Sequence, residues 1–350
     1  MSTSRSTRGL ATVATALLLA GCGATSGGSG GPKLGFAVAT TSEDFAQQMA
    51  DGGEYAAAKF DGVELQVSGP PGVDGPAEVK LLQDLGRTAV DGIAVENLAP
   101  DLFVRPMSDL VRQERRLVAV DTVPLDGSDV TTYVGNDNVA IGRMLADEAI
   151  RLLGPDAGGT VVVGTTVPGV PVLDQRADGI KQAFAAKLPN VRVLGPFETK
   201  IEPTLNFGIW NGLVKANPRA LAFLGTGDQD SYNLAKIKQE NNGKYLTAGF
   251  DLNAATLRAV KDGTNFATLS PEHFMKGAVA IRMLAEAATK DKPLPEGWVD
   301  AGALLVTKDN VDEIIARQGS EPAKDKWFGP KLDEFFADLG AHTRPLNEAS

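Results

Sequence analysis

From Lys33 onward, short apolar runs alternate with amphipathic stretches, and this alternation limits the architectures open to the chain. In the first part of the chain, the runs that we interpret as strands are 34–39, 63–67, 92–95 and 117–120. The stretches with helical spacing of apolar residues are 45–60, 78–90 and 102–115. Strands that are apolar on both faces and separated by helices indicate a parallel sheet covered on both sides.

The alternation begins again near residue 160. The second set of predicted strands is 160–163, 191–194, 220–224, 245–250 and 266–269. The helical stretches of this set are 174–187, 204–216, 231–241 and 253–261. Two sets of similar size predict an α/β protein with two doubly wound parallel-sheet lobes and right-handed crossovers.

Open parallel sheets bind ligands beyond the carboxyl ends of their strands, so the residues after each strand are the candidates for a site. These segments are 40–45, 96–97, 121, 136–137, 165–176, 226–229, 251 and 270–272. They are rich in carboxylates and amides, and they contain neither a phosphate-binding loop nor a catalytic set. Such side chains suit neutral hydroxyl groups. We therefore expect a binding protein and not an enzyme, with no catalytic residues.

Composition excludes several classes of partner and cofactor. The net charge of −10 argues against nucleic acid, because phosphate binding needs a basic face. Cys22 is the only cysteine, so no intramolecular disulfide can form. The two histidines, His273 and His342, have no second cysteine with which to form a zinc site, and no calcium-loop motif is present. We expect neither a metal nor a cofactor.

The first residues have the pattern of processing signals. Arg5 and Arg8 precede an apolar segment, 10–20, that is too short to span a bilayer. It ends in the sequence 19–22, Leu-Ala-Gly-Cys, which resembles a lipobox and predicts lipidation of Cys22. We therefore expect a lipoprotein signal peptide at 1–21 and a flexible Gly/Ser tether at 22–31. The alternatives are an uncleaved membrane anchor or a cysteine placed there by chance.

The order of several short motifs resembles the ribose-type (type I) periplasmic sugar-binding proteins, the substrate-binding subunits of ABC sugar importers. The likeness runs over roughly 33–308. The motifs are Phe45 after the first strand, Asp91-Gly92-Ile93, Val120-Asp121, Tyr133 to Asn138 with Gly142, Arg176 to Ile180, and Ala248 to Asp251. Their order and spacing are more specific than any one of them.

This resemblance implies two lobes joined by a three-segment hinge, with crossings near Asn136, Pro271 and 298–300. The N-terminal lobe would comprise 32–136 with 271–299, and the C-terminal lobe 137–270 with 300–340. It also implies an extracytoplasmic monomer that holds a small sugar or polyol between its lobes. The partners would be the membrane subunits of an ABC importer, and the only membrane contact would be the lipid anchor at the outer face or in the periplasm.

The family's ligand contacts carry over to individual residues of this sequence. Phe45 matches an aromatic residue that packs on the sugar ring. Asp121 and Asp251 match aspartates that accept hydroxyl hydrogen bonds. Arg176 matches an arginine that donates to sugar oxygens, and Asn136 lies at a small polar contact beside the hinge.

Other positions depart from the family pattern, which makes ribose itself doubtful as the ligand. Glu43 and Glu96 stand where the ribose proteins have asparagines. Asp228 lies in 225–229, a segment that differs from the usual Gln-Asn-Asp. Glu272 is the polar residue nearest to the position of a family glutamine.

Each site residue also has a purely structural interpretation. Phe45 could cap the first helix, and the aspartates could be turn residues. Arg176 could pair with Asp174 or Asp178 on a helix surface. Glu43 could be a first-turn glutamate favoured by the helix dipole, and 226–229 could be only a helix N-cap region. For His273 we expect an exposed helix position. The alternative function is the same fold binding a signalling molecule, such as a furanosyl autoinducer, or a nucleoside.

Overall fold

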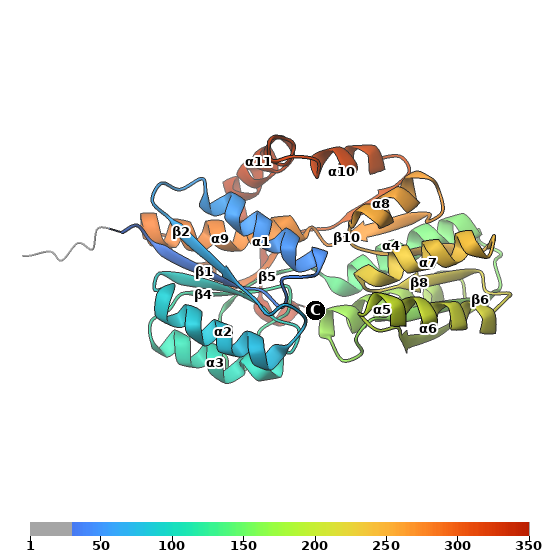
Figure 1. The fold of residues 1–350 in the computed structure, drawn as a ribbon, viewed down its shortest axis with the longest axis horizontal. Helices are drawn as coiled ribbons and strands as arrows, with labels where there is room; N and C mark the ends of the chain where they lie inside the picture. The colour runs from blue at the N-terminus through green and yellow to red at the C-terminus, as the bar shows by residue number, and fades with distance from the viewer. Residues whose placement is uncertain (1–29, 350) are drawn as a thin grey trace, which may run out of the picture. The chain divides into compact units, whose positions relative to one another are not determined.

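The computed structural model describes residues 30–349, whose strands form two separate sheets, each flanked by helices (Figure 1). The predicted α/β class with two parallel-sheet lobes is therefore confirmed. Cys22, the expected signal peptide and nearly all of the expected tether lie outside the described residues.

The first sheet forms the N-terminal lobe. Its strands, in spatial order, are β13 (Thr343–Arg344), β11 (Gly297–Asp300), β5 (Thr132–Gly135), β4 (Leu117–Val120), β3 (Gly92–Glu96), β1 (Lys33–Ala37) and β2 (Glu64–Ser68). All neighbours are parallel except β13 and β11. Leu34 and Phe36 pack into one core cluster and Ala37 into another, as the alternation of a strand's side chains requires.

Helices cover both faces of this sheet. One face packs against α1 (Asp44–Ala57), α9 (His273–Lys290) and α11 (Glu321–Ala337). The other face packs against α2 (Gly75–Thr88) and α3 (Pro100–Arg112). Short 3₁₀ turns, η1 (Leu339–His342) and η2 (Leu346–Glu348), flank β13.

The second sheet forms the C-terminal lobe. Its strands, in spatial order, are β12 (Leu304–Thr307), β10 (Ala267–Ser270), β9 (Leu246–Phe250), β8 (Ala222–Gly225), β6 (Gly159–Thr165) and β7 (Val191–Glu198). Only β12 is antiparallel to its neighbour. The helices are α4 (Asn138–Leu153), α5 (Pro171–Lys187), α6 (Pro203–Ala216), α7 (Asp228–Glu240), α8 (Ala254–Lys261) and α10 (Val311–Arg317).

Close helix pairs in both lobes hold the helices that carry polar residues of the site. A Cβ at Gly52 of α1 would lie 2.0 Å from the carbonyl oxygen of Phe274, and a Cβ at Gly277 of α9 would lie 1.9 Å from that of Met49. In the other lobe, a Cβ at Gly142 of α4 would lie 2.2 Å from the carbonyl oxygen of Arg176. Only glycine permits these approaches, so the sequence fixes α9 against α1 and α5 against α4.

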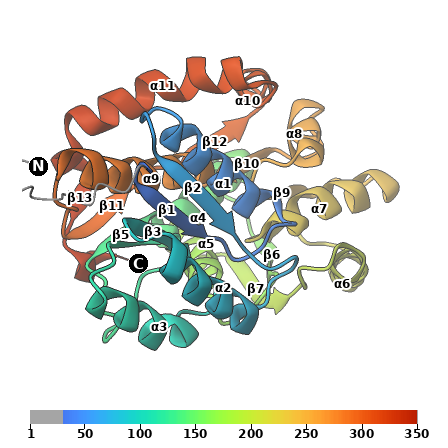
Figure 2. The same cartoon turned by 60° about the vertical axis from the view of Figure 1, so that its left-hand side comes forward.

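Within residues 30–349, the chain passes between the two sheets four times. It leaves the first sheet after β5, returns after β10, and leaves again between β11 and β12. The sequence analysis placed 300–340 in the C-terminal lobe, and for α11 this is wrong. Phe328, Leu332 and Phe335 of α11 are buried in the core cluster of the first sheet, so a fourth passage lies between α10 and α11 (Figure 2).

Candidate functional site

A cavity lies at the carboxyl ends of strands from both sheets. Its lining comes from the loops after β3, β4, β6, β7, β8 and β9 and from the N-terminal ends of α1, α5, α7 and α9. The lining residues are Phe45, Leu98, Asp121, Thr166, Val167, Val170, Val172, Leu173, Arg176, Ile201, Gly227, Asp228, Gln229, Asp251 and His273. Five of the nine predicted ligand residues therefore line one cavity: Phe45, Asp121, Arg176, Asp228 and Asp251.

Asp121 and Asp251 occupy equivalent positions in the two lobes. Each directly follows a strand, and each has a left-handed backbone, with φ of 67° and 71°. The N–H of Asp121 donates to the carbonyl of Val134 on the neighbouring strand, and that of Asp251 donates to Leu269, both at 2.9 Å. Aspartate tolerates this conformation better than most residues. The matching geometry turns both carboxylates toward the cavity that the two lobes share.

Asp121 forms a buried ion pair with Lys276 of α9. The side chain of Lys276 is fully buried, and its Nζ donates to Oδ1 of Asp121. Burial alone would raise the pKa of Asp121, but the charges of Lys276, His273 and Arg176 outweigh it and lower the pKa to about 2. Asp121 is therefore ionised at neutral pH.

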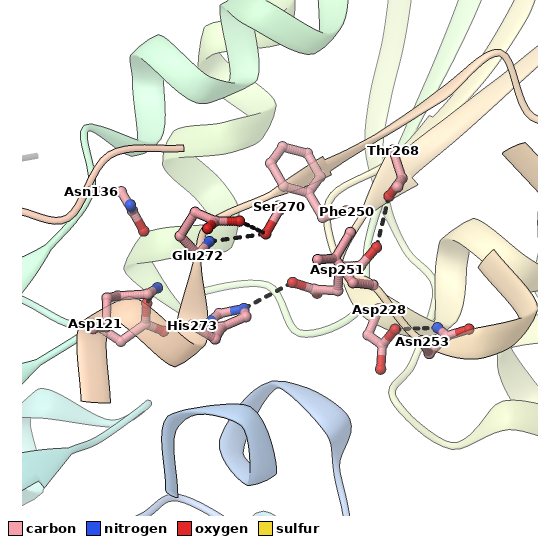
Figure 3. A network of polar contacts seen from close by, with 12 residues as sticks. Asp121, Asn136, Asp228, Phe250, Asp251, Asn253, Thr268, Ser270, Glu272 and His273 are labelled. Atoms are coloured by element: carbon pink, nitrogen blue, oxygen red, sulfur yellow. Dashed lines mark hydrogen bonds and ion pairs between the residues drawn. The ribbon is translucent and has the colours of Figure 1, made fainter. Parts of the chain in front are cut away.

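Asp251 is held by His273, the first residue of α9. Nε2 of His273 lies 2.8 Å from Oδ1 of Asp251 (Figure 3). Burial, and then the charge of Lys276, lower the pKa of His273, while its hydrogen bond with Asp251 opposes this shift. The expectation that His273 is exposed is wrong: it is 3% exposed and lines the cavity, because α9 packs against α1 with its first turn under the site.

Asp228 and Arg176 add an acidic and a basic side chain from the second lobe. Asn253 donates to Oδ1 of Asp228 (Figure 3). Burial, followed by the charge of Asp251, raises the pKa of Asp228 well above its usual range. Arg176 is buried, donates through Nη1 to the carbonyl of Thr226 at 3.0 Å, and lies 4.6 Å from the centre of the Phe250 ring.

The structural alternative proposed for Arg176 does not hold. Asp174 accepts a hydrogen bond from the backbone of Gly169, and Asp178 pairs with Lys181. Phe45 is half-buried, and its ring centre lies 5.9 Å from that of His273 across one side of the cavity. Phe45 is therefore not merely a cap on α1.

Glu43 contacts the opposite lobe without lining the cavity. Nε2 of Gln229, in the first turn of α7, donates to Oε2 of Glu43 at 2.6 Å. Gln229 itself lines the cavity, and our list of single residues omitted it although its segment was included.

Three other predicted residues lie around the cavity rather than in its lining. Glu96 is fully buried at the end of β3 and accepts from the backbone N–H of Ala39 at 3.0 Å. Nδ2 of Asn136 donates to the carbonyl of Gly302 at 2.5 Å, which joins two of the chain crossings. Glu272 forms a bidentate ion pair with Arg317. These contacts are structural.

The sequence analysis missed Lys276 and two apolar lining residues, Leu98 and Ile201, whereas Val167 and Val170 lie within the candidate segment 165–176. Lys276 is the one charged residue in the apolar segment 274–281 of α9, a pattern that signals a buried partner. Leu98 and Ile201 carry no comparable signal in a single sequence. Within the described residues, no group of three or more potential ligand side chains is arranged to hold a metal ion.

Comparison with known proteins places this geometry in context. The ribose import binding protein of Haemophilus influenzae is 23% identical to the chain over 290 residues, which cover 83% of this chain and 95% of that protein. A solute-binding protein of an ABC transporter from Burkholderia graminis, solved with D-arabinose, is 24% identical to the chain and superimposes with a TM-score of 0.72. The alignment covers 81% of this chain and 96% of that protein. One from Agrobacterium vitis, solved with D-fucose, is 22% identical with a TM-score of 0.74 and covers 81% of this chain and 98% of its own.

The structural likenesses establish the fold, whereas the family match also establishes the family. The family described as the periplasmic binding protein domain matches residues 34–292, a range that includes most of both lobes and every residue that lines the cavity. The family and these relatives are binding proteins for transport rather than enzymes. The chain belongs to the periplasmic binding protein family.

Proposed function

We propose that the protein captures a small neutral sugar or polyol between its two lobes. The observation that carries this proposal is the composition of the cavity, which places the ring of Phe45 beside carboxylates from both lobes. The pairs with Lys276 and His273 engage only Oδ1 of Asp121 and Asp251. Within the described part of the chain, Oδ2 of each is left for another donor, such as a ligand hydroxyl.

The charges of the cavity favour a neutral ligand over an anionic one. Asp121, Asp228 and Asp251 line the cavity, and Arg176 is the only lysine or arginine among the described lining residues. A phosphate or carboxylate on the ligand would therefore lie close to more acidic than basic side chains of the described lining. The relatives solved with D-arabinose and D-fucose bind neutral sugars, which supports the same class.

Closure of the lobes would hold the ligand. Two contacts join the lobes at the cavity: Gln229 with Glu43, and His273 with Asp251. A ligand shifts the equilibrium toward the closed form only through its higher affinity for that form. Contacts with both lobes supply this difference, because an open form can offer only one of the two sets.

The remaining parts of the proposal concern location and partners. We propose that Cys22 carries a lipid anchor, that the protein acts as a monomer outside the cytoplasm, and that its closed form delivers ligand to the membrane subunits of an ABC importer. The sequence 19–22 and the Gly/Ser segment after it support the anchor, and the family supports the importer. No helix within residues 30–349 is long and apolar enough to cross a membrane.

A thermal-shift screen tests the proposed ligand class, because a ligand that binds only the folded state raises the melting temperature. The panel contains pentoses, hexoses, polyols, their phosphates and nucleosides. We expect a neutral sugar or polyol to stabilise the protein, calorimetry to give one saturable event, and mass spectrometry to recover the ligand unchanged. Stabilisation by nucleosides alone would favour the alternative ligand class, and a hydrolysed or oxidised product would contradict a binding protein.

A further inference from the structure

The chain continues past the family match, which ends at residue 292, into two helices that connect the lobes. We call α10 and α11 with their short connection, residues 311–337, the C-terminal strap. Val311 and Ile314 of α10 pack with α8 and β12 of the second lobe. Phe328 and Leu332 of α11 pack with α9 and the first sheet. Figure 1 shows α11 above α1 and α9, and α10 beside α8. The strap is therefore anchored by apolar cores at both of its ends.

Arg317, the last residue of α10, lies where the strap passes between the lobes. It is 4% exposed, and its Nη1 and Nη2 donate to the two carboxylate oxygens of Glu272 at 3.0 and 2.8 Å. Its guanidinium lies 5.3 Å from the ring of Trp327 and 5.0 Å from that of Phe328, both on α11. A bidentate, stacked arginine is a rigid connection that lysine would not reproduce.

Glu272 lies in the second crossing of the hinge, between β10 and α9. Its backbone is left-handed, with φ of 51°, a conformation that a glutamate keeps only when its surroundings hold it. Ser270 Oγ donates to its carboxylate at 2.7 Å (Figure 3). The next residue is His273, which lines the cavity and bonds Asp251. Glu272, which Arg317 holds, is therefore next in sequence to a residue that lines the cavity.

We propose that Arg317 is a positioning residue that ties the second hinge crossing to the C-terminal strap and so limits how far the lobes separate. The inference rests on the proposed closure of the lobes. With Arg317 in place, rotation about the crossing must either break the pair with Glu272 or carry the strap with it. The apolar anchors at both ends of the strap oppose the second of these movements.

The distance between the lobes in the ligand-free protein tests this role. The experiment uses the full chain with Cys22→Ala and with spin labels at Ala58→Cys and Ala186→Cys, two exposed positions on opposite lobes. We expect Arg317→Met to broaden the distance distribution and to shift its mean by more than about 2 Å, the size of a rearrangement rather than of side-chain adjustment. Arg317→Met alone also leaves the carboxylate of Glu272 without its partner and should lower the melting temperature. The double variant Arg317→Met with Glu272→Gln removes this charge, so its melting temperature should recover while the distance between the labels stays shifted.

Lys324→Met is the matched control. Lys324 belongs to the same strap but pairs with Asp51 of α1, within the first lobe, so its loss leaves the distances unchanged. The proposal is overturned if Arg317→Met keeps the wild-type distribution, or if the double variant restores distance and melting temperature together. Because no ligand is added, a failed ligand screen leaves this test intact, and a successful screen with unchanged distances refutes only the role of Arg317.

Discussion

Replacing Glu96 with glutamine is expected to stabilise the ligand-free protein at alkaline pH and to flatten its pH dependence. Glu96 is fully buried; its Oε2 accepts from Ala39, while its Oε1 has no partner within the described residues. Burial, and then the charge of Asp121, raise its pKa from 4.5 to about 8. Glu78 of α2 lies in the same environment, where burial and then the charge of Glu96 raise its pKa to about 9.

The sign of the effect follows from proton uptake on folding. An acid whose pKa is higher in the folded state than in the unfolded state binds a proton as the chain folds at any pH between the two values. Its contribution is fully present below pH 4.5 and is lost as the pH rises toward about 8. In that window one such carboxyl changes the free energy of unfolding by up to about 1.4 kcal/mol per pH unit.

Urea unfolding of the wild type and of Glu96→Gln at about pH 5 and about pH 8 measures this slope. The amide oxygen of glutamine can still accept from Ala39, so the variant should keep this contact. The change of its free energy of unfolding with pH should be smaller than that of the wild type by the contribution of one carboxyl, up to about 1.4 kcal/mol per pH unit. Glu64→Gln, at an exposed position of β2, is the control and should leave the slope unchanged. A wild-type slope in Glu96→Gln would show that Glu96 is ionised in the folded protein and would refute the reasoning.

Two other variants probe the ion pair beneath the cavity and the membrane anchor. Lys276→Met leaves the charge of Asp121 buried without its partner, so we expect a loss of about 3–5 kcal/mol in urea unfolding, largely recovered by adding Asp121→Asn; an unchanged stability would contradict the buried pair. Cys22→Ala should abolish labelling with a fatty acid and release the folded protein from the membrane fraction, and equal labelling of the variant would contradict the anchor.

The alternation of apolar runs and helical stretches predicted both lobes because each strand and helix is determined by the residue pattern within its own segment. Runs such as 117–120 and 246–250 are apolar on both faces, and only a covered parallel strand satisfies them. The same logic predicted that Asp121 and Asp251 stand at the carboxyl edges of the sheets. Both lie there, and both line the cavity.

The parts that could not be predicted depend on contacts between distant segments. The apolar face of α11 shows that it packs on something, but not on which sheet, so its lobe was assigned wrongly. Glu272 was chosen by its position in the chain, whereas its role depends on Arg317, 45 residues later. His273 has no local signal of burial, because the close packing of α9 on α1 decides it.

The central claim is that one ligand is held by residues of both lobes, and calorimetry of two single variants tests it most directly. Phe45→Ala removes an aromatic face from the first lobe, with Phe197→Ala, an exposed ring outside the cavity, as its control. Asp251→Asn removes a charge from the second lobe but keeps an oxygen that can accept from His273.

Burying a phenylalanine ring contributes about 1.5–3 kcal/mol, and a hydrogen bond to a charged group contributes about the same. A tenfold change in Kd corresponds to about 1.4 kcal/mol. With the sugar or polyol found in the thermal-shift screen, the account predicts that Phe45→Ala and Asp251→Asn each weaken binding by roughly tenfold or more, while Phe197→Ala binds as the wild type does. Unchanged affinity in either Phe45→Ala or Asp251→Asn would contradict a ligand site shared between the lobes.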